Sequence, residues 1–388
     1  MPPLPRKRVL VISSVVPDEL ALGGSLILKR HLVDNPDVIS HVLRSAPIRL
    51  LAKIRARLKR TRLHRLVSNL EYLSACLVNE KLADRLIQEF KPDLIFSVAH
   101  GWSYLLAVKV SRRWNLPLVM LYQDWWPDSA DVSNFLCPLV ERQFRHACTV
   151  SQVALCVSVG MQVELRSPPN CVVLHDIPSK VSLQKSSRGG CYRIVYFGNL
   201  HEYGPMIENA LRYCLENPKI RLEVFGPAPN WSPRAEDEFR SMGLYHGLVS
   251  PREIQKQIAR FDAGLIVMRF DEAMQRRMRT SFPSKLIEMA QFGKPLVIWG
   301  PEYCSAVQWA RKGGRALCVT DPNPCVLGAS LEALAASPID QDRLAIAACQ
   351  AARTDFNPER IRTQFMGALE SAIKHTYAAK PFVKHACH

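Results

Sequence analysis

The sequence predicts an α/β protein made of two doubly wound domains, and three observations support this. Short apolar, β-branched runs alternate with longer amphipathic stretches along the chain. These runs are apolar throughout, which is typical of strands buried on both faces of a parallel sheet. A polar segment near residue 185 interrupts the alternation, which then restarts, and 388 residues are enough for two domains.

The first half of the chain contains the apolar runs of one parallel sheet. Helices are expected at 25–33 and 102–114, and right-handed β-α-β crossovers would place such helices on both faces of the sheet. The expected strands are 9–12, 38–43, 94–98, 117–121, 154–157 and 172–174.

The second half repeats this pattern after the segment KVSLQKSSRGG (180–190), whose Gly, Ser and Lys content is typical of a linker. The expected strands are 193–197, 220–225, 263–268, 295–298 and 316–319, and the end of the chain (358–378) is expected to be helical. The predicted organisation is an N-terminal domain (1–180), a linker (181–190), a C-terminal domain (191–365) and a final helix and tail (366–388). Two such domains facing each other would form a central cleft.

Composition excludes several classes of protein. Apolar residues make up 48% of the chain and charged residues 22%, so it is neither disordered nor fibrous. The 12 cysteines are scattered, without the spacing of a zinc site, and several lie in apolar runs. Reduced core thiols favour the cytoplasm. No signal peptide and no stretch of about 20 apolar residues is present, so we expect a protein without a membrane-spanning helix.

Several polar or glycine-rich segments directly follow expected strands, where ligands bind in open α/β sheets. Gly23 and Gly24 open a helix after the first strand, and glycine allows close approach of the backbone to an anion. Gly198 and Asn199 follow the first strand of the second domain. Each segment has an alternative interpretation as an ordinary turn.

The segment 280–300 carries a more specific pattern. Pro283 and Ser284 are expected to open a helix with Ser284 as its N-cap, and Lys285 would add positive charge where a phosphate could bind. Glu288, one turn later, could accept hydrogen bonds from a ribose diol. The combination favours a nucleotide site, with a capped structural helix as the alternative.

Two segments of the first domain combine polar groups with aromatic rings. His100 follows one expected strand, and Asp124 follows the next, beside Trp125 and Trp126. Indole rings stack on sugar faces and carboxylates accept hydrogen bonds from hydroxyls, so these residues are candidates for binding a sugar or another acceptor. The alternative is that both tryptophans are packing residues.

The segments 196–204, 223–229, 245–254 and 281–300 resemble, in this order, those of glycosyltransferases with the GT-B fold, most like the retaining family 4 group. The DWWP run (124–127) resembles the branch that builds bacterial surface polysaccharides. The resemblance implies two Rossmann-like domains and transfer of a sugar from a nucleotide-sugar donor to a glycan or lipid-linked acceptor, in cell-surface polysaccharide synthesis. It implies neither a metal ion nor a cofactor, because the nucleotide sugar is a co-substrate.

The resemblance also implies roles for individual residues. Gly24 would approach the donor phosphate, and the amides near Ser284 would hold the diphosphate together with Lys285. The other implied contacts are of the donor base with the backbone of Gly247 and Leu248, of the ribose with Glu288, and of the acceptor and reacting carbon with His100 and Asp124.

Two features depart from the family pattern. The family often has two glutamates separated by seven residues, and counting back from Glu288 places Thr280 at the first of them, which contacts the transferred sugar. The basic residue often found after the first strand of this domain is not evident either, and Arg269 or the cluster Arg276, Arg277 and Arg279 could supply its charge. Two other hypotheses therefore stay open: a catalytically inactive GT-B-like nucleotide-binding protein, and a nucleotide-sugar epimerase.

The strongest charge bias lies between residues 44 and 65, which contain nine Lys or Arg and no acidic residue in a chain of net charge +16. Leucine and isoleucine recur there at helical spacing, so a basic amphipathic helix is expected at 47–66. Such a helix favours an anionic membrane surface at the inner face of the membrane. Nucleic acid is disfavoured because interleaved aromatic residues and a known motif are absent. The candidate membrane-binding residues are Arg49, Lys53, Arg55, Arg57, Lys59 and Arg60.

Overall fold

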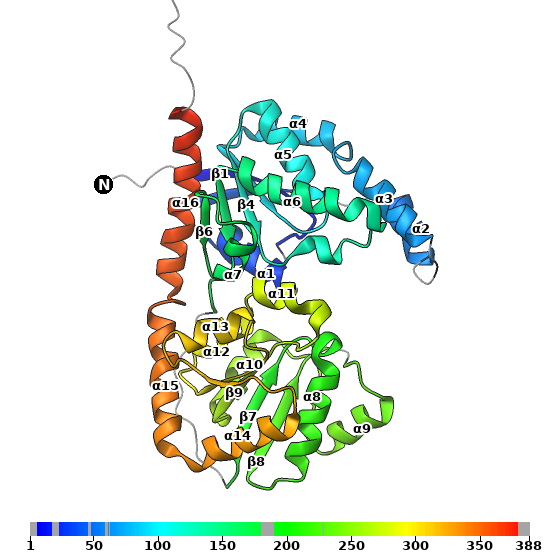
Figure 1. Cartoon of the computed structure of the whole chain (residues 1–388). Helices are drawn as coiled ribbons and strands as arrows, with labels where there is room; N and C mark the ends of the chain where they lie inside the picture. Colours follow the sequence, from blue (N-terminus) through cyan, green and yellow to red (C-terminus); the bar gives the residue numbers. More distant parts are fainter. Residues whose placement is uncertain are drawn as a thin grey trace, which may run out of the picture. The chain divides into compact units, whose positions relative to one another are not determined.

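The computed structural model describes residues 6–378 apart from 18–22, 46–47, 59–60, 62, 180–189 and 228. The chain divides into two compact units, Met1–Ile177 with Ile361–His388, and Pro178–Arg360 (Figure 1). The predicted linker lies outside the described residues except for Gly190.

The strands of the first unit form a parallel sheet in the order β2-β1-β3-β4-β5-β6. These strands are β1 (Lys7–Ser13), β2 (Val38–Arg44), β3 (Leu94–Val98), β4 (Leu118–Tyr122), β5 (Val153–Cys156) and β6 (Cys171–Val173). The chain winds outward in one direction to β2 and in the other from β3 onward, so the order reverses between β1 and β3. In open α/β sheets this point of reversal is where ligands bind, beyond the carboxyl ends of the strands.

Helices cover both faces of this sheet (Figure 1). The helices of this unit are α1 (Gly24–Leu28), α2 (Arg49–Leu58), α3 (His64–Ser74), α4 (Glu80–Phe90), α5 (Ser103–Trp114), α6 (Cys137–Val150), α7 (Val159–Glu164) and α16 (Pro358–Ala378), with a π-helical turn at Lys29–Val33 and 3-10 turns at Trp126–Ser129 and Asn134–Leu136. Leu10 and Ile12 of β1 face the core shared with α4 to α7, and Val9 and Val11 face the opposite core. This alternation explains why the strand is apolar throughout.

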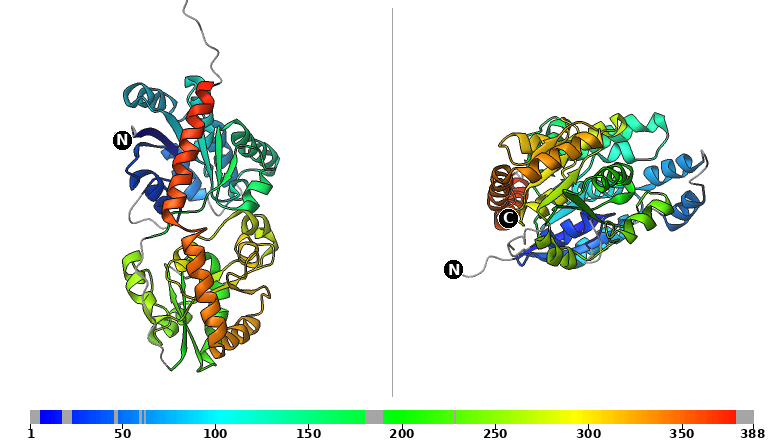
Figure 2. Two further views of the ribbon diagram at one scale, coloured as in Figure 1. Left: turned by 90° about the vertical axis from the view of Figure 1, so that its left-hand side faces the viewer. Right: turned by 90° about the horizontal axis from the view of Figure 1, so that it is seen from below.

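Helix α16 closes the second face of the first unit, although it follows the whole second unit in sequence. Figure 2 shows it running across this sheet. Phe365 and Leu369 are fully buried there, and the Phe365 ring lies 4.8 Å from that of His31. The predicted domain limits placed the start of this helix (358–365) in the C-terminal domain and the rest in a separate tail, because its apolar spacing does not say which sheet it covers.

The second unit has a parallel sheet in the order β11-β10-β9-β7-β8, with its own reversal between β7 and β9. The strands are β7 (Tyr192–Phe197), β8 (Ile220–Phe225), β9 (Ala263–Val267), β10 (Leu296–Trp299) and β11 (Leu317–Val319). The helices are α8 (Leu200–Leu215), α9 (Pro233–Ser241), α10 (Pro251–Gln257), α11 (Gln275–Thr280), α12 (Ser284–Ala290), α13 (Ser305–Arg311), α14 (Pro324–Ala336) and α15 (Pro338–Arg353), with 3-10 turns at Ile258–Arg260 and Glu272–Met274. Separate cores lie on the two faces, one with α8, α9 and α14 and the other with α12, α13 and α15. Two doubly wound α/β units confirm the predicted fold class.

Two predicted helices differ from the structure. The helix expected at 25–33 is α-helical only to Leu28 and then forms a π-helical turn, in which the Asp34 amide donates to the Lys29 carbonyl at 2.9 Å. This wider turn carries His31 and Leu32, which are both buried.

The basic helix expected at 47–66 is two helices, α2 and α3, rather than one. Helix α2 ends at Leu58, whose carbonyl accepts hydrogen bonds from the backbone amide and the hydroxyl of Thr61. A threonine that bonds to a preceding carbonyl competes with continuation of a helix, which explains the break. Lys59 and Arg60 lie outside the described residues.

Two observations concern the whole described chain. The cysteines among the described residues are free thiols. No helix formed by these residues is both long enough and apolar enough to cross a membrane.

Candidate functional site

Three glycines line the carboxyl edge of the sheet in the second unit. The Gly198 amide, after β7, donates to the Phe225 carbonyl at 2.9 Å, and the Gly226 amide, after β8, donates to the Gly247 carbonyl at 2.9 Å. A Cβ atom on Gly226 would collide with the Gly198 carbonyl oxygen. The backbones at Gly198 and Gly226 therefore approach more closely than any residue with a side chain would allow.

Lys285 of α12 lies against this glycine edge. A Cβ atom on Gly198 would collide with Cε of Lys285, so the absence of a side chain at Gly198 makes room for the lysine. Burial lowers the pKa of the Lys285 ammonium group, and the Glu202 carboxylate opposes this shift. The arrangement places a lysine beside half-buried, side-chain-free backbone at the end of β7.

Glu202 organises the charge around Lys285. Its carboxylate forms an ion pair with Arg277 of α11, with Nη1 of the arginine 3.2 Å from Oε1 of Glu202, and it also accepts from Nδ2 of Asn199 at 3.3 Å. Asn199 caps α8, because its Oδ1 accepts from the amides of His201 and Glu202. Asn199 therefore positions Glu202, which in turn holds Arg277 near the strand end.

Glu288 lies one turn after Lys285 on the same helix. Its two carboxylate oxygens accept from the Ser179 amide at 3.1 and 3.3 Å. Ser179 is the last described residue before the linker, so Glu288 fixes the point at which the chain enters the second unit.

The segment expected to contact a base is arranged as a turn followed by a helix. Gly247 adopts a φ of +72°, in the left-handed region that favours glycine, and Leu248 is 61% exposed. Helix α10 then begins at Pro251 with a capping box between Ser250 and Glu253.

Two details of the segment 280–300 differ from expectation. The N-cap of α12 is Pro283, and Ser284 is the first residue of the helix without capping it, because Pro283 already has the extended backbone of a cap. Thr280 is fully buried, and its hydroxyl donates to the Arg276 carbonyl at 3.0 Å. The hydroxyl of Thr280 therefore serves the end of α11 and does not replace the carboxylate that the resemblance implied there.

In the first unit, His100 follows β3 at the reversal point of the sheet. Its carbonyl accepts from the Ser14 hydroxyl at 2.8 Å, and its ring lies 4.6 Å from that of Trp126. Gly101 has a φ of +67°, and a Cβ atom there would lie 2.7 Å from the Ser14 hydroxyl oxygen. The loops after β1 and β3 are therefore packed tightly together.

His100 and Trp126 both line a cavity of about 320 Å³ in this unit. The neighbouring Trp125, in contrast, is fully buried between the Phe144 ring and the Arg145 guanidinium group, so it is a packing residue. Asp124 is half-buried, and its carbonyl accepts from the Trp126 amide at 2.9 Å, but it does not line the cavity.

Gly23 and Gly24 are at the start of α1, after β1. Gly23 has a φ of +69°, and a Cβ atom on Gly24 would lie 2.8 Å from Oε1 of Gln123, the residue after β4. Gly24 therefore lies close to the Gln123 side chain at the carboxyl edge of the sheet.

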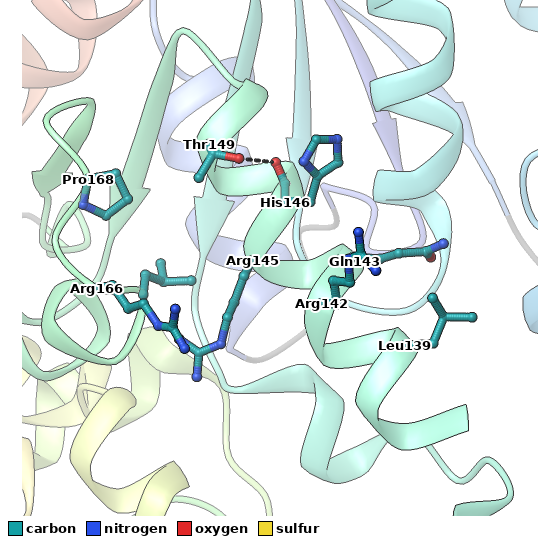
Figure 3. Close-up of a pocket in the computed structure, with 9 residues that line it drawn as sticks. Leu139, Arg142, Gln143, Arg145, His146, Thr149, Arg166 and Pro168 are labelled. Atoms are coloured by element: carbon teal, nitrogen blue, oxygen red, sulfur yellow. Dashed lines mark hydrogen bonds between the residues drawn. The ribbon is translucent and has the colours of Figure 1, made fainter. Parts of the chain in front are cut away.

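A larger hollow in the first unit lies elsewhere (Figure 3). It is lined by residues of α6 and of the loop after α7, including Arg142, Arg145, His146 and Arg166. Arg145 is ion-paired with Glu141 at 2.8 Å. Thr149 and Pro168 in this lining precede β5 and β6, so the hollow is at the amino edge of the sheet, opposite to the candidate residues.

Comparisons with known proteins found structural relatives only. No protein-family model and no curated protein sequence matches this chain. The sucrose-phosphate synthase of Thermosynechococcus elongatus superposes with a TM-score of 0.66 at 14% identity, over 97% of this chain and 100% of the other. The Anabaena protein HepE in complex with UDP gives a TM-score of 0.66 at 14% identity, over 94% and 100% of the two chains. The trehalose-6-phosphate synthase of Burkholderia multivorans gives 0.59 at 13%, over 97% and 100%.

The chain has the GT-B fold. The likeness spans nearly all of each chain, so it includes both doubly wound units. Within this fold, Gly198, Asn199, Gly247 and Lys285 meet at or near one sheet edge of the second unit.

Sequence reasoning missed two acidic residues near these sites. Glu202 holds Arg277 and opposes the pKa shift of Lys285, and Glu71 of α3 lines the cavity of the first unit. Glu202 stood in the YFGNLHEYG segment, where a carboxylate in the first turn after a capping asparagine was a usable signal. Glu71 carried no local signal, because only the fold places it near the strand ends.

Proposed function

We propose that this protein is a glycosyltransferase that moves a sugar from a nucleotide-sugar donor to a glycan or lipid-linked acceptor. The observation that carries the proposal is the Lys285 side chain lying against the side-chain-free backbone of Gly198. A cation beside side-chain-free backbone at the carboxyl end of a strand suits a diphosphate, because both features lower the free energy of an anion there.

The donor chemistry in this proposal depends on charge placed before the reaction. When the bond between the sugar and the diphosphate breaks, negative charge develops on the leaving oxygen, and Lys285 would stabilise it. Arg277, held by Glu202, supplies a second cation near the same strand end. These cations perform the role that a metal ion has in other transferases, so the proposal requires no metal.

Other residues are assigned to the donor by proposal. Glu288 would accept hydrogen bonds from the ribose hydroxyls, since an ionised carboxylate acts only as an acceptor. The backbone of Gly247 and Leu248 would contact the base, and Gly23 and Gly24 the phosphate. HepE has been solved with UDP-glucose, which makes uridine nucleotides the first donors to try.

The acceptor side is assigned to the first unit. His100 and Asp124 would lie toward the acceptor and the reacting carbon, and His100 lines the cavity described above. Retention of the anomeric configuration and a role in cell-surface polysaccharide synthesis stay predictions from the family resemblance.

The proposal predicts selective nucleotide binding that depends on Glu288. One nucleoside diphosphate among UDP, GDP and ADP, or its sugar conjugate, is expected to raise the melting temperature, since a ligand that binds only the folded state stabilises it by mass action. Glu288→Ala is expected to weaken this binding roughly tenfold, by loss of hydrogen bonds to a charged acceptor. Differential scanning fluorimetry with each nucleotide measures both effects.

The matched control is Glu216→Ala, at the exposed end of α8. Equal nucleotide binding by the Glu288 variant and wild type would contradict the assigned role. Release of nucleoside diphosphate with an acceptor lipid or glycan then separates the hypotheses. Nucleotide binding without release under any acceptor favours the inactive protein, which the burial of Thr280 makes a specific rival. A changed sugar still attached to the nucleotide favours the epimerase.

We further propose that the protein works in the cytoplasm, attached peripherally to the inner face of the membrane through α2 and α3. On α2, Lys53 and Arg57 are exposed, whereas Arg55 lies near Glu71. Arg49 is the first residue of this helix. Each basic residue near an anionic leaflet contributes about 1 kcal/mol, so a few are enough for reversible binding.

Helix α3 adds an apolar surface that the sequence analysis did not identify. Leu66, Leu70 and Leu73 recur every three or four residues and are each more than half exposed, so they share one face of the helix. Leu63 and Leu77 continue this stripe beyond the two helix ends. The α2 positions Leu51 and Ile54 are only half-buried, and α2 packs on α3. Exposed leucines beside basic residues favour insertion at a lipid interface.

Binding to vesicles tests this attachment. Binding is expected to rise with the anionic lipid fraction and to fall with salt, because salt screens surface charge. The double variant Lys53→Glu, Arg57→Glu is expected to lose most of it, in a vesicle sedimentation assay. The matched control Lys81→Glu, Arg85→Glu makes the same charge change on the exposed side of α4. Equal binding to neutral and anionic vesicles would contradict the electrostatic account.

A further inference from the structure

The cavity of the first unit is built from segments far apart in the sequence. Its floor is the carboxyl edge of the sheet, where Ser14, Ser45 and His100 follow β1, β2 and β3. Helices α2 and α3 contribute Arg55 and Glu71 to the opposite side. The cavity therefore spans the point where the strand order reverses, between β1 and β3.

Glu71 is an unusual group in such a lining. Its side chain is fully buried, and neither carboxylate oxygen accepts a hydrogen bond from any described residue. The closest cation is Arg55, whose Nη1 atom lies 3.4 Å from Oε2. A buried carboxylate without hydrogen bonds costs several kcal/mol, so a ligand that donates to it would recover much of that free energy.

Other unsatisfied polar atoms belong to the same part of the first unit. Among the described residues, the Ser68 hydroxyl, the Tyr72 hydroxyl and the Trp126 indole N–H are buried without a hydrogen-bond partner. Ser68 and Trp126 line the cavity together with Glu71. The cavity thus offers acceptors and donors in the same small volume.

Aromatic rings form one wall. Trp102 and Trp126 line the cavity with ring centroids 5.6 Å apart in an edge-to-face arrangement, and Tyr72 packs behind Trp102 at 5.1 Å. An apolar ring face next to a carboxylate and a hydroxyl matches the surface of a sugar, which has apolar C–H faces and a rim of hydroxyls.

We propose that this cavity binds one saccharide unit of the acceptor, with a sugar hydroxyl donating to Glu71 and a sugar face against Trp126. The inference rests on the proposed function and adds a ligand class and a specificity-determining residue to it. The volume of about 320 Å³ suits a single sugar ring rather than a long glycan. Glu71 acts here as a binding group.

Two further observations agree with this site. Burial raises the pKa of the Glu71 carboxyl group, although Arg55 opposes the shift, and both its protonated and ionised forms can accept from a hydroxyl. Helix α3 also carries the exposed leucines on its other side, so the same helix lies between the cavity and the proposed lipid surface. A lipid-linked sugar would contact both the cavity and the lipid surface.

The competing interpretation is that Glu71 exists only to pair with Arg55. Their contact is not a hydrogen bond, and Arg55 keeps 41% of its side chain exposed, so the pair leaves the carboxylate unsatisfied. A purely structural pair predicts that Glu71→Gln changes stability and leaves sugar affinity unchanged.

The test is titration of the full chain with methyl glycosides of glucose, galactose, mannose and N-acetylglucosamine, followed by tryptophan fluorescence. At least one glycoside is expected to give a saturable change. Glu71→Gln is expected to raise its Kd roughly 10- to 100-fold, the value of a hydrogen bond to a charged group. Trp126→Phe is expected to reduce the fluorescence change, and Glu89→Gln, on the exposed side of α4, is the matched control.

Three outcomes decide the inference. Absence of a saturable change with every glycoside overturns it, and so does an unchanged Kd in Glu71→Gln. If that variant does not fold, Ser68→Ala replaces it, with a rise in Kd expected and an unchanged Kd overturning the site. UDP binding measured on the same samples separates the two proposals. Glycoside binding through Glu71 without any nucleotide binding would contradict the proposed transferase and support the sugar site. Nucleotide binding without glycoside binding would support the transferase and contradict the sugar site.

Discussion

Lys285→Met is expected to lower kcat/KM for donor turnover by roughly 100-fold or more, the usual loss when one preorganised charge partner of a leaving group is removed. Methionine has an unbranched apolar side chain of nearly the same length as the lysine stem that lies against Gly198, and it lacks the ammonium group. The loss should therefore come from charge rather than from packing. Steady-state release of nucleoside diphosphate measures it.

Gly198→Ala is expected to displace the same Lys285 ammonium group. Its new Cβ atom would collide with Cε of Lys285, so the lysine must move away from the strand end. Both variants are expected to weaken binding of the nucleoside diphosphate, as seen by a smaller rise in melting temperature. Lys312→Met, at the exposed end of α13, is the matched control and should behave as wild type. A Lys285→Met enzyme with wild-type turnover would rule out the assigned role.

The first unit is expected to lose stability steeply in mild acid because of His31. This histidine is buried, its Nδ1 has no partner among the described residues, and it packs against Phe365 of α16. Burial, together with the charges of Arg30 and Arg362, lowers its pKa from 6.5 to about 3. The unfolded chain therefore binds a proton between these values that the folded chain excludes.

The direction of the effect follows from this difference. The stabilising contribution is complete above pH 6.5 and is lost as the pH falls toward 3, by about 1.4 kcal/mol per pH unit. Between pH 6.5 and about pH 5 the loss is roughly 2 kcal/mol. His31→Leu should remove this part of the acid sensitivity, in urea unfolding followed by circular dichroism over that pH range.

His41→Leu, at an exposed position of β2, is the matched control and should keep the wild-type pH dependence. If wild type and His31→Leu lose stability in parallel as the pH falls, then His31 is not the group responsible.

Much of the fold could be predicted from local pattern. The strands at Ile220–Phe225 and Leu94–Val98 and the helix at Pro358–Ala378 have the predicted limits. A strand buried on both faces has to be apolar along its length. A helix with one buried face has to have apolar residues every three or four positions. Both patterns can therefore be recognised in a short window of sequence. The failures came where a local contact competed, as with Thr61 and the end of α2.

The candidate site was predictable only in part, for the same reason. Glycines and polar residues after strands can be found in a sequence, because the carboxyl edge of a parallel sheet is a fixed place in the fold. Whether a side chain there faces a ligand depends on what packs against it. Trp125 and Trp126 are adjacent in sequence, yet the first is sealed in the core and the second lines a cavity. Thr280 is likewise turned into its own helix.

The sequence by itself determined the α/β class, the repeat of the pattern and the positions of the loops that follow the strands, since each depends on residues close together along the chain. The tertiary structure alone decided that Lys285 lies against Gly198, that α16 covers the first unit, and that Glu71 is buried without hydrogen bonds at the strand ends. These contacts join residues dozens to hundreds of positions apart. Their energies depend on burial and on the partners that folding brings together, which no local window of sequence contains.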